Sequence, residues 1–139
     1  MLEVEVLGSR LLPDGPEPDE VRRLCAVAAA RRGVGDGHVA VEFVDAARIA
    51  ALNAAHRGLA GPTDVLSFPI DGVAATNDSS EPPSPVPREL GDVVICPDHA
   101  SDVREAIVHG MLHLLGMDHE IDQGEMLALQ DELLAGPRR

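Results

Sequence analysis

Three histidines in the C-terminal third of the chain are spaced like the ligands of a single metal ion. His109 and His113 are four residues apart and His119 follows six residues later, which gives the pattern His-x3-His-x5-His. Residues four apart on a helix lie on one face, so two imidazoles can bind one ion. Gly116 suits the left-handed conformation that ends a helix, after which the chain can turn and bring His119 back to the site. Three protein ligands leave a coordination position for water, which is typical of a catalytic centre.

The donor atoms and the residues around them indicate which metal and which reaction to expect. Imidazole nitrogens predict one divalent transition metal ion per chain. In zinc peptidases with this spacing, a glutamate directly after the first histidine is the general base. Here that position is Gly110. The metal helix is therefore similar to that of a metzincin, but peptide hydrolysis by the metzincin route lacks its base.

The segment that carries the first two histidines is predicted to be a buried helix over residues 102–115. Asp102 and Glu105 can form a capping box at its start, and the residues that follow are apolar almost all round. Histidines inside such a helix need partners, because burying an unpaired polar group costs free energy. A shared metal ion would satisfy both rings at once. The alternative is that the histidines are unrelated and that backbone groups satisfy each of them.

Four strands and four helices are expected to position these histidines. Alternating apolar and polar residues predict strands, and apolar residues three to four apart predict helices. The order β-α-β-α-β-loop-β-α-α predicts a single α+β domain over residues 1–139, with a small mixed four-stranded sheet packed with helices. The third strand, with Thr63, Asp64 and Ser67, is expected at the sheet edge beside the site. The expected strands are 2–7, 39–44, 65–68 and 93–96, and the expected helices are 19–32, 45–56, 102–115 and 122–135.

Residues 71–90 are expected to form a flexible surface insertion in this domain. The segment contains four prolines, no aromatic residue and little periodicity. A structureless loop of this length is unusual within a compact domain. Its two ends could still pair as a hairpin.

The charge and composition restrict how the chain could recognise a nucleic acid. The net charge is −13 at pH 7, and aromatic residues make up only 1% of the chain. Neither a broad basic surface nor an aromatic surface for stacked bases is therefore expected. An anionic substrate would have to be recognised locally, by a metal ion and a few arginines. No DNA partner is predicted.

The chain has the features of a soluble cytoplasmic protein. Cys25 and Cys96 are expected to be free, buried thiols. The N-terminal segment alternates apolar and acidic residues and lacks the apolar core of an export signal. No stretch approaches the roughly 18 apolar residues that a membrane-spanning helix needs. We therefore expect a cytoplasmic location and no membrane partner.

Two sequence blocks resemble the YbeY family of metal-dependent endoribonucleases. Residues 109–119, HGMLHLLGMDH, resemble its HGxLHLxGxDH signature. Residues 62–69, PTDVLSFP, preceded by Leu-Asn and by Arg57, are similar to its LN…R…PTDVLSFP run. Residues 91–95, GDVVI, match its GDIVI strand, and the resemblance extends from the first strand to about residue 134. The chain departs from the family pattern in its proline-rich insertion and in a shorter connection before the metal helix.

The resemblance implies a zinc-dependent, single-strand-specific endoribonuclease that hydrolyses phosphodiester bonds in ribosomal RNA precursors. It implies roles in small-subunit rRNA maturation and ribosome quality control, with the ribosomal particle or ribosomal proteins as partners. It also implies that Arg57 is functional. A guanidinium can grip phosphate oxygens through paired donors, although Arg57 could instead be a surface cation at a helix end. Asp118 could support the metal ligands or accept a proton, or could be a turn residue.

Two other functions are compatible with the same histidines. The first is a metalloprotease that uses Asp118 or Glu105 as its base in place of the missing glutamate. The second is a ribosome assembly or binding factor that cuts no bond. In that case a fourth ligand such as Asp118 would close a structural metal site.

Overall fold

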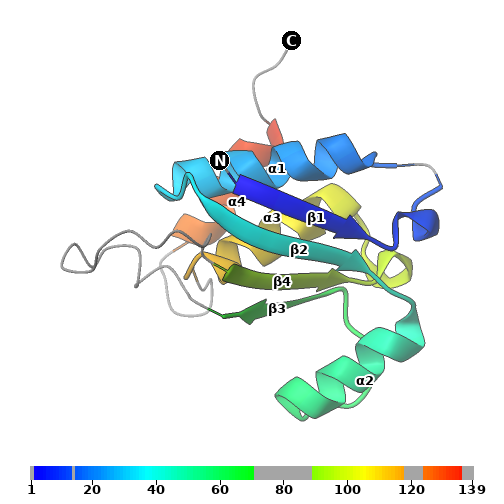
Figure 1. Cartoon of the computed structure of the whole chain (residues 1–139). Coiled ribbons are helices and arrows are strands. Elements are labelled where there is room, and N and C mark those ends of the chain that lie inside the picture. The colour runs from blue at the N-terminus through cyan, green and yellow to red at the C-terminus, as the bar shows by residue number, and fades with distance from the viewer. Residues whose placement is uncertain (1, 14, 71–88, 118–123, 136–139) are drawn as a thin grey trace.

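Four strands form one mixed sheet in the computed structural model, which describes residues 2–13, 15–70, 89–117 and 124–135. The strands in chain order are β1 (Leu2–Leu7), β2 (Gly37–Phe43), β3 (Val65–Pro69) and β4 (Glu89–Ile95). Their order in the sheet is β1-β2-β4-β3 (Figure 1). β1 is parallel to β2 and β2 to β4, whereas β3 is an edge strand antiparallel to β4. The predicted α+β fold, mixed four-stranded sheet and edge position of the third strand are confirmed.

Two helices cover one face of the sheet with a third packed against them, and one helix packs on the other face (Figure 1). The helices are α1 (Pro18–Arg31), α3 (Val103–Leu114) and α4 (Glu125–Ala135) on the first face and α2 (Ala46–Arg57) on the second, with short 3-10 helices η1 (Ser9–Leu11) and η3 (Pro97–His99) in the connections. Successive strand residues point to opposite faces. Val93 of β4 therefore joins the core beneath α1 and α3, whereas Val94 packs with Ile49 of α2. None of the helices within the described ranges is long and apolar enough to cross a bilayer.

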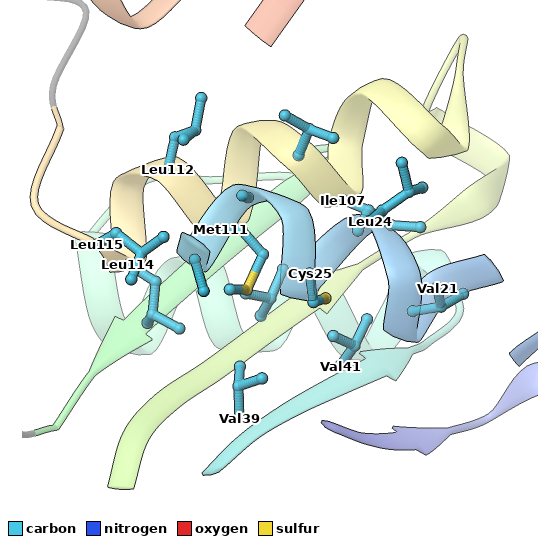
Figure 2. Packing of buried hydrophobic residues seen from close by; sticks show 14 of the residues in the cluster. Val21, Leu24, Cys25, Val39, Val41, Ile107, Met111, Leu112, Leu114 and Leu115 are labelled. Carbon is cyan, nitrogen blue, oxygen red and sulfur yellow. The ribbon is translucent and has the colours of Figure 1, made fainter. Parts of the chain in front are cut away.

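The main core lies between the sheet and the helices α1 and α3. Val39 and Val41 of β2 point toward Cys25 of α1 and Met111 of α3, and all four side chains are fully buried (Figure 2). With two Phe and no Trp or Tyr in the chain, aliphatic side chains and Met fill this volume. Burial raises the pKa of the Cys25 thiol to about 12. Cys25 and Cys96 are both free and buried, as predicted.

Aspartates cap two of the helices, and the sequence predicts the cap at Asp102. The Asp45 carboxylate accepts a hydrogen bond from the backbone N–H of Arg48 at 2.8 Å, at the start of α2. The Asp102 carboxylate accepts one from the N–H of Glu105 at 3.3 Å, at the start of α3. Such caps satisfy backbone donors that the helix itself leaves unpaired. The cap at Asp102 therefore determines where the histidine-bearing helix begins.

Two ion pairs connect α1 to the other helices on its face of the sheet. Arg104 of α3 donates to Glu20 of α1, with Nη2 2.9 Å from Oε1, and this hydrogen bond holds the pKa of Glu20 below its usual value. Arg31 at the end of α1 pairs with Glu132 of α4. Because these side chains are 27% to 60% exposed, the pairs contribute little to stability, but they link α1 to α3 and α4.

The main difference from the predicted elements lies at the start of β4. The sequence predicts this strand from Val93 onward, but it begins at Glu89, within the expected insertion. The carbonyl of Leu90 accepts a hydrogen bond from the N–H of Ile70 at 3.0 Å, which extends the antiparallel ladder beyond the short predicted strand. Ile70, which directly precedes the expected insertion, is therefore hydrogen-bonded to the last residue of that insertion, and residues 89–90 belong to the sheet. The predicted flexibility concerns 71–88, which lie outside the described residues.

Candidate metal centre

His109 and His113 lie on one face of α3, a turn apart, as predicted. Their ring centroids are 4.8 Å apart and their ring planes meet at 74°. Both residues are half-buried, whereas Val108, Met111 and Leu112 beside them are fully buried. The two rings therefore occupy a strip of α3 that the core leaves partly open. A close pair of imidazoles in such a place fits a divalent transition metal.

The chain turns sharply just after the second histidine. Gly116 has φ 97°, a left-handed conformation that suits glycine. Its N–H donates to the carbonyl of His113 at 3.0 Å, and the N–H of Met117 donates to the carbonyl of Leu112 at 2.9 Å. These two hydrogen bonds form a Schellman motif, which ends the helix within a few residues of His113. The predicted glycine-dependent helix end is confirmed.

Gly110, between the two histidines, lies against the sheet. A Cβ atom at this position would come within 2.5 Å of Cγ1 of Val93 and 3.0 Å of Cγ2 of Val65. The hydroxyl of Ser67 on β3 donates to the carbonyl of Gly110 at 2.8 Å. The residue after the first histidine is therefore glycine because the helix touches the edge of the sheet there. A glutamate base in this position would point into β3 and β4 and away from the two rings.

Gln130 of α4 contacts the first histidine from the other side. Nδ1 of His109 lies 2.8 Å from Oε1 of Gln130. Gln130 is a buried residue, with 6% of its surface exposed. An amide oxygen can only accept a hydrogen bond, so the proton of this pair lies on Nδ1 of the imidazole. The other ring nitrogen, Nε2, then carries no proton, and its lone pair is available to bind a metal ion.

The predicted third ligand and its neighbour are not among the described residues. His119 and Asp118 both lie in the segment 118–123 that the structure does not describe. Within the described part of the chain, no group of three His, Cys, Asp or Glu residues could hold a metal ion. The described residues thus provide two nitrogen donors, and the assignment of His119 stays a prediction.

Arg57 does not meet the histidines in the structure. It is exposed in the last turn of α2, and Gly58 with φ 68° ends that helix. The neighbouring His56 lies against Phe68 of β3, with ring centroids 4.4 Å apart, so the end of α2 is held on the far face of the edge strand. No hydrogen bond or ion pair between described residues joins Arg57 to His109. The predicted role of Arg57 stays a prediction.

Gln130 is the residue of this site that sequence reasoning missed. Its signal was present in the spacing of α4. Met126, Gln130 and Leu133 are four and three residues apart and all are buried, so they form the inward face of the helix. A polar residue on that face must have a buried partner. The sequence alone does not say which residue that partner is, because the contact joins two different helices.

Comparison with known proteins gives the family. The family model described as Endoribonuclease YbeY matches residues 19–137. The chain belongs to the YbeY endoribonuclease family. Two relatives of that name are similar over nearly their whole length. The protein from Macrococcus caseolyticus is 35% identical over 96% of this chain and 94% of its own, and that from Micrococcus luteus is 36% identical over 96% and 91%. The predicted resemblance is confirmed, and the family is one of nucleases, a class of hydrolases.

A third relative and a solved structure are similar to this chain over part or most of their length. The Endoribonuclease YbeY of Corynebacterium glutamicum is 39% identical over 72% of this chain, but the match covers only 58% of that protein. The solution structure of TM1509 from Thermotoga maritima has a TM-score of 0.53 and 26% sequence identity, over 94% of this chain and 86% of that chain. The fold described here is therefore similar to an experimentally observed one over most of its length.

Proposed function

We propose that the chain is a zinc-dependent endoribonuclease that hydrolyses phosphodiester bonds in single-stranded ribosomal RNA precursors. The observation that supports this most is the pair of half-buried imidazoles on α3, 4.8 Å apart, in a chain of an endoribonuclease family. His109 and His113 would hold the ion, with His119 as the third ligand. A bound divalent ion lowers the pKa of a water ligand toward neutrality and polarises a phosphoryl oxygen.

The other proposed residues would bind the substrate and move a proton. Arg57 would bind a phosphate of the RNA, because its planar guanidinium offers paired donors and stays charged at neutral pH. Its exposure at the end of α2 is compatible with contact to a large polyanion. Asp118, next to the third ligand in sequence, would accept a proton from the attacking water or orient a ligand ring.

The charge of the chain supports a substrate that is presented by a partner. At −13, the protein repels a free polyanion, and phosphate contacts usually dominate affinity for RNA. Delivery of the RNA on a ribosomal particle, through ribosomal protein or RNA contacts, would compensate for this repulsion. The proposed roles are therefore small-subunit rRNA maturation and ribosome quality control.

Two rival functions make different demands on the site. A metalloprotease needs a base near the ion, and because a side chain at residue 110 would collide with Val93 of the sheet, Asp118 or Glu105 would have to be that base. A ribosome assembly factor with a structural metal needs a fourth protein ligand in place of water, for which Asp118 is the candidate. The assay of RNA cleavage separates the enzyme from both.

The decisive assay compares metal-loaded wild-type protein with His113→Ala on single-stranded and duplex RNA. We expect single-stranded RNA to be cleaved and the variant to lose more than about 100-fold in rate, since loss of mere support for a ligand costs up to about 100-fold. His99→Ala is the matched control, because His99 is an exposed histidine in η3. Intact RNA with metal-loaded wild-type protein would contradict the proposal and favour the assembly factor.

A second assay tests the phosphate-binding role of Arg57. We expect Arg57→Ala to lower kcat/KM for RNA by about 10- to 100-fold, which corresponds to a lost charge-assisted hydrogen bond of about 1.5–3 kcal/mol. Arg57→Lys should recover part of the loss because the charge remains. Arg48→Ala on the same helix is the control. RNA cleavage by Arg57→Ala at the wild-type rate would remove this residue from the mechanism.

A further inference from the structure

We infer that Gln130 is a positioning residue of the metal centre, whose buried amide holds His109 in the tautomer that binds a metal through Nε2. The inference rests on the proposed function, because it concerns His109 as a metal ligand. It adds a residue from α4 to a site that the sequence motif confines to α3 and the segment after it.

The hydrogen bond itself defines the direction of the effect. Oε1 of Gln130 lies 2.8 Å from Nδ1 of His109, a normal length for an N–H···O hydrogen bond. The oxygen has no proton to give, so the ring must donate. Nδ1 and Nε2 flank one ring carbon and point in divergent directions, so a ring that donates through Nδ1 to Gln130 presents Nε2 away from that amide oxygen. The ring is both oriented and set in one tautomer before any ion arrives.

The position of the amide is well defined by packing. Met126 and Leu133, one turn before and one turn after Gln130, are 0% and 6% exposed. They anchor α4 in the main core, and the ion pair of Glu132 with Arg31 links the same helix to α1. A buried amide in such a place keeps its orientation only with a hydrogen-bonding partner. His109 provides that partner at a sequence separation of 21 residues.

The opposite arrangement has a different chemical consequence. If the amide were reversed, its NH2 group would donate to Nδ1 and the imidazole proton would be on Nε2. A ring in that state would have to lose or move a proton before it could bind an ion through Nε2. The two arrangements can therefore be told apart in the metal-free protein, without any enzymatic assay.

The first measurement is the imidazole tautomer in metal-free protein, by long-range 1H–15N correlation of the His rings at about pH 8, where an ordinary imidazole is neutral. We expect the Nδ1–H tautomer for His109 in wild-type protein, with the signal assigned through its absence in His109→Gln. Gln130→Glu should keep this tautomer, because a carboxylate can only accept. Gln130→Met should lose the preference. A wild-type Nε2–H tautomer would overturn the inference.

The second measurement is zinc affinity, by competition with a chromophoric chelator. We expect Gln130→Met to bind zinc about 10- to 100-fold more weakly than wild type, the usual loss when the partner of a ligand is removed. Gln130→Glu should stay close to wild type. Asp131→Asn is the control, because Asp131 is an exposed neighbour on the same helix.

The outcomes separate this inference from the proposed function. If wild-type protein and Gln130→Met bind zinc with the same affinity, the positioning role of Gln130 is wrong, but the metal site still stands. Wild-type protein that binds no zinc would overturn the metal site and the inference with it. A folding defect of the Met variant would be seen by circular dichroism, and the Glu variant then decides: loss of the Nδ1–H tautomer there overturns the inference.

Discussion

Gly110 shows how one residue can determine both packing and chemistry. It separates the two histidines, and its carbonyl accepts a hydrogen bond from Ser67 of the edge strand. A side chain here would press on Val93, which is fully buried and branched at Cβ and so cannot easily move. The missing peptidase base is therefore explained by the contact of α3 with β3 and β4. The hydrogen bond between Ser67 and Gly110 holds the histidine-bearing turn against the sheet edge.

Replacing this glycine should destabilise the fold. We expect Gly110→Ala to lower the free energy of unfolding by about 1–2 kcal/mol, because an approach of 2.5 Å to Val93 places overpacking in the upper part of its usual range, about 2–3 kcal/mol, and the better helix propensity of Ala returns about 1 kcal/mol. Urea denaturation measures the change. Gly35→Ala is the control, since a Cβ there meets no atom within 4 Å, and it should change stability by less than about 0.5 kcal/mol. Wild-type stability of Gly110→Ala would contradict the packing argument.

At the scale of elements, a histidine outside the metal site connects three strands. His38 of β2 lies with Nδ1 2.7 Å from Glu89 of β4 and with Nε2 3.5 Å from Glu5 of β1. The hydrogen bond with Glu89 raises the pKa of His38 above its usual value, and the charges of Glu89 and Glu5 add to this. The protonated ring on the central strand β2 therefore attracts a carboxylate on each of its two parallel neighbours, β1 and β4.

This contact predicts a pH-dependent contribution to stability. Because the pKa of His38 is raised in the folded state, its contribution is complete below the unfolded pKa of about 6.5 and disappears as the pH rises through the folded pKa. We expect His38→Gln to reduce the free energy of unfolding by up to about 1 kcal/mol at about pH 5.5, and by less at about pH 8.5. Denaturation of His99→Gln at both pH values is the control. A His38→Gln effect that grows with pH would contradict the assignment.

The elements could be predicted from the sequence wherever local pattern determines them. The buried face of α1, the Asp45 and Asp102 caps and the glycine after α3 all follow from residues close together in the chain. The start of β4 could not be predicted, because Glu89 and Leu90 join the sheet only through pairing with distant strands. Gln130 was missed for the same reason.

The same distinction applies to the candidate site. The four-residue spacing of His109 and His113 was enough to place both rings on one face of α3. Neither spacing nor composition could say that Arg57 ends a helix on the far face of the edge strand. That position depends on how α2 packs through Ile49 against Leu66 and Val94. Contacts between elements, rather than the motif itself, determine the surroundings of the two histidines.

At the scale of the whole molecule, the acidic charge predicts how activity depends on salt and on presentation of the RNA. Repulsion at −13 leaves only a few local phosphate contacts to hold free RNA. For about two such contacts on single-stranded RNA, affinity should fall about 7-fold between about 50 and 200 mM salt. We expect the same RNA segment to be cleaved faster on a ribosomal particle than free at about 150 mM salt. Equal rates on both substrates would contradict delivery by the ribosome.

The most direct test of the metal centre is the zinc content of purified protein, measured by mass spectrometry after dialysis. Wild-type protein loaded with zinc should retain one ion per chain. His113→Ala, folded by circular dichroism, should retain less than about a tenth of that, because two remaining nitrogen ligands hold a divalent ion weakly. A His113→Ala variant with one zinc per chain, or a wild-type protein with none, would contradict the central claim that these histidines share a metal ion.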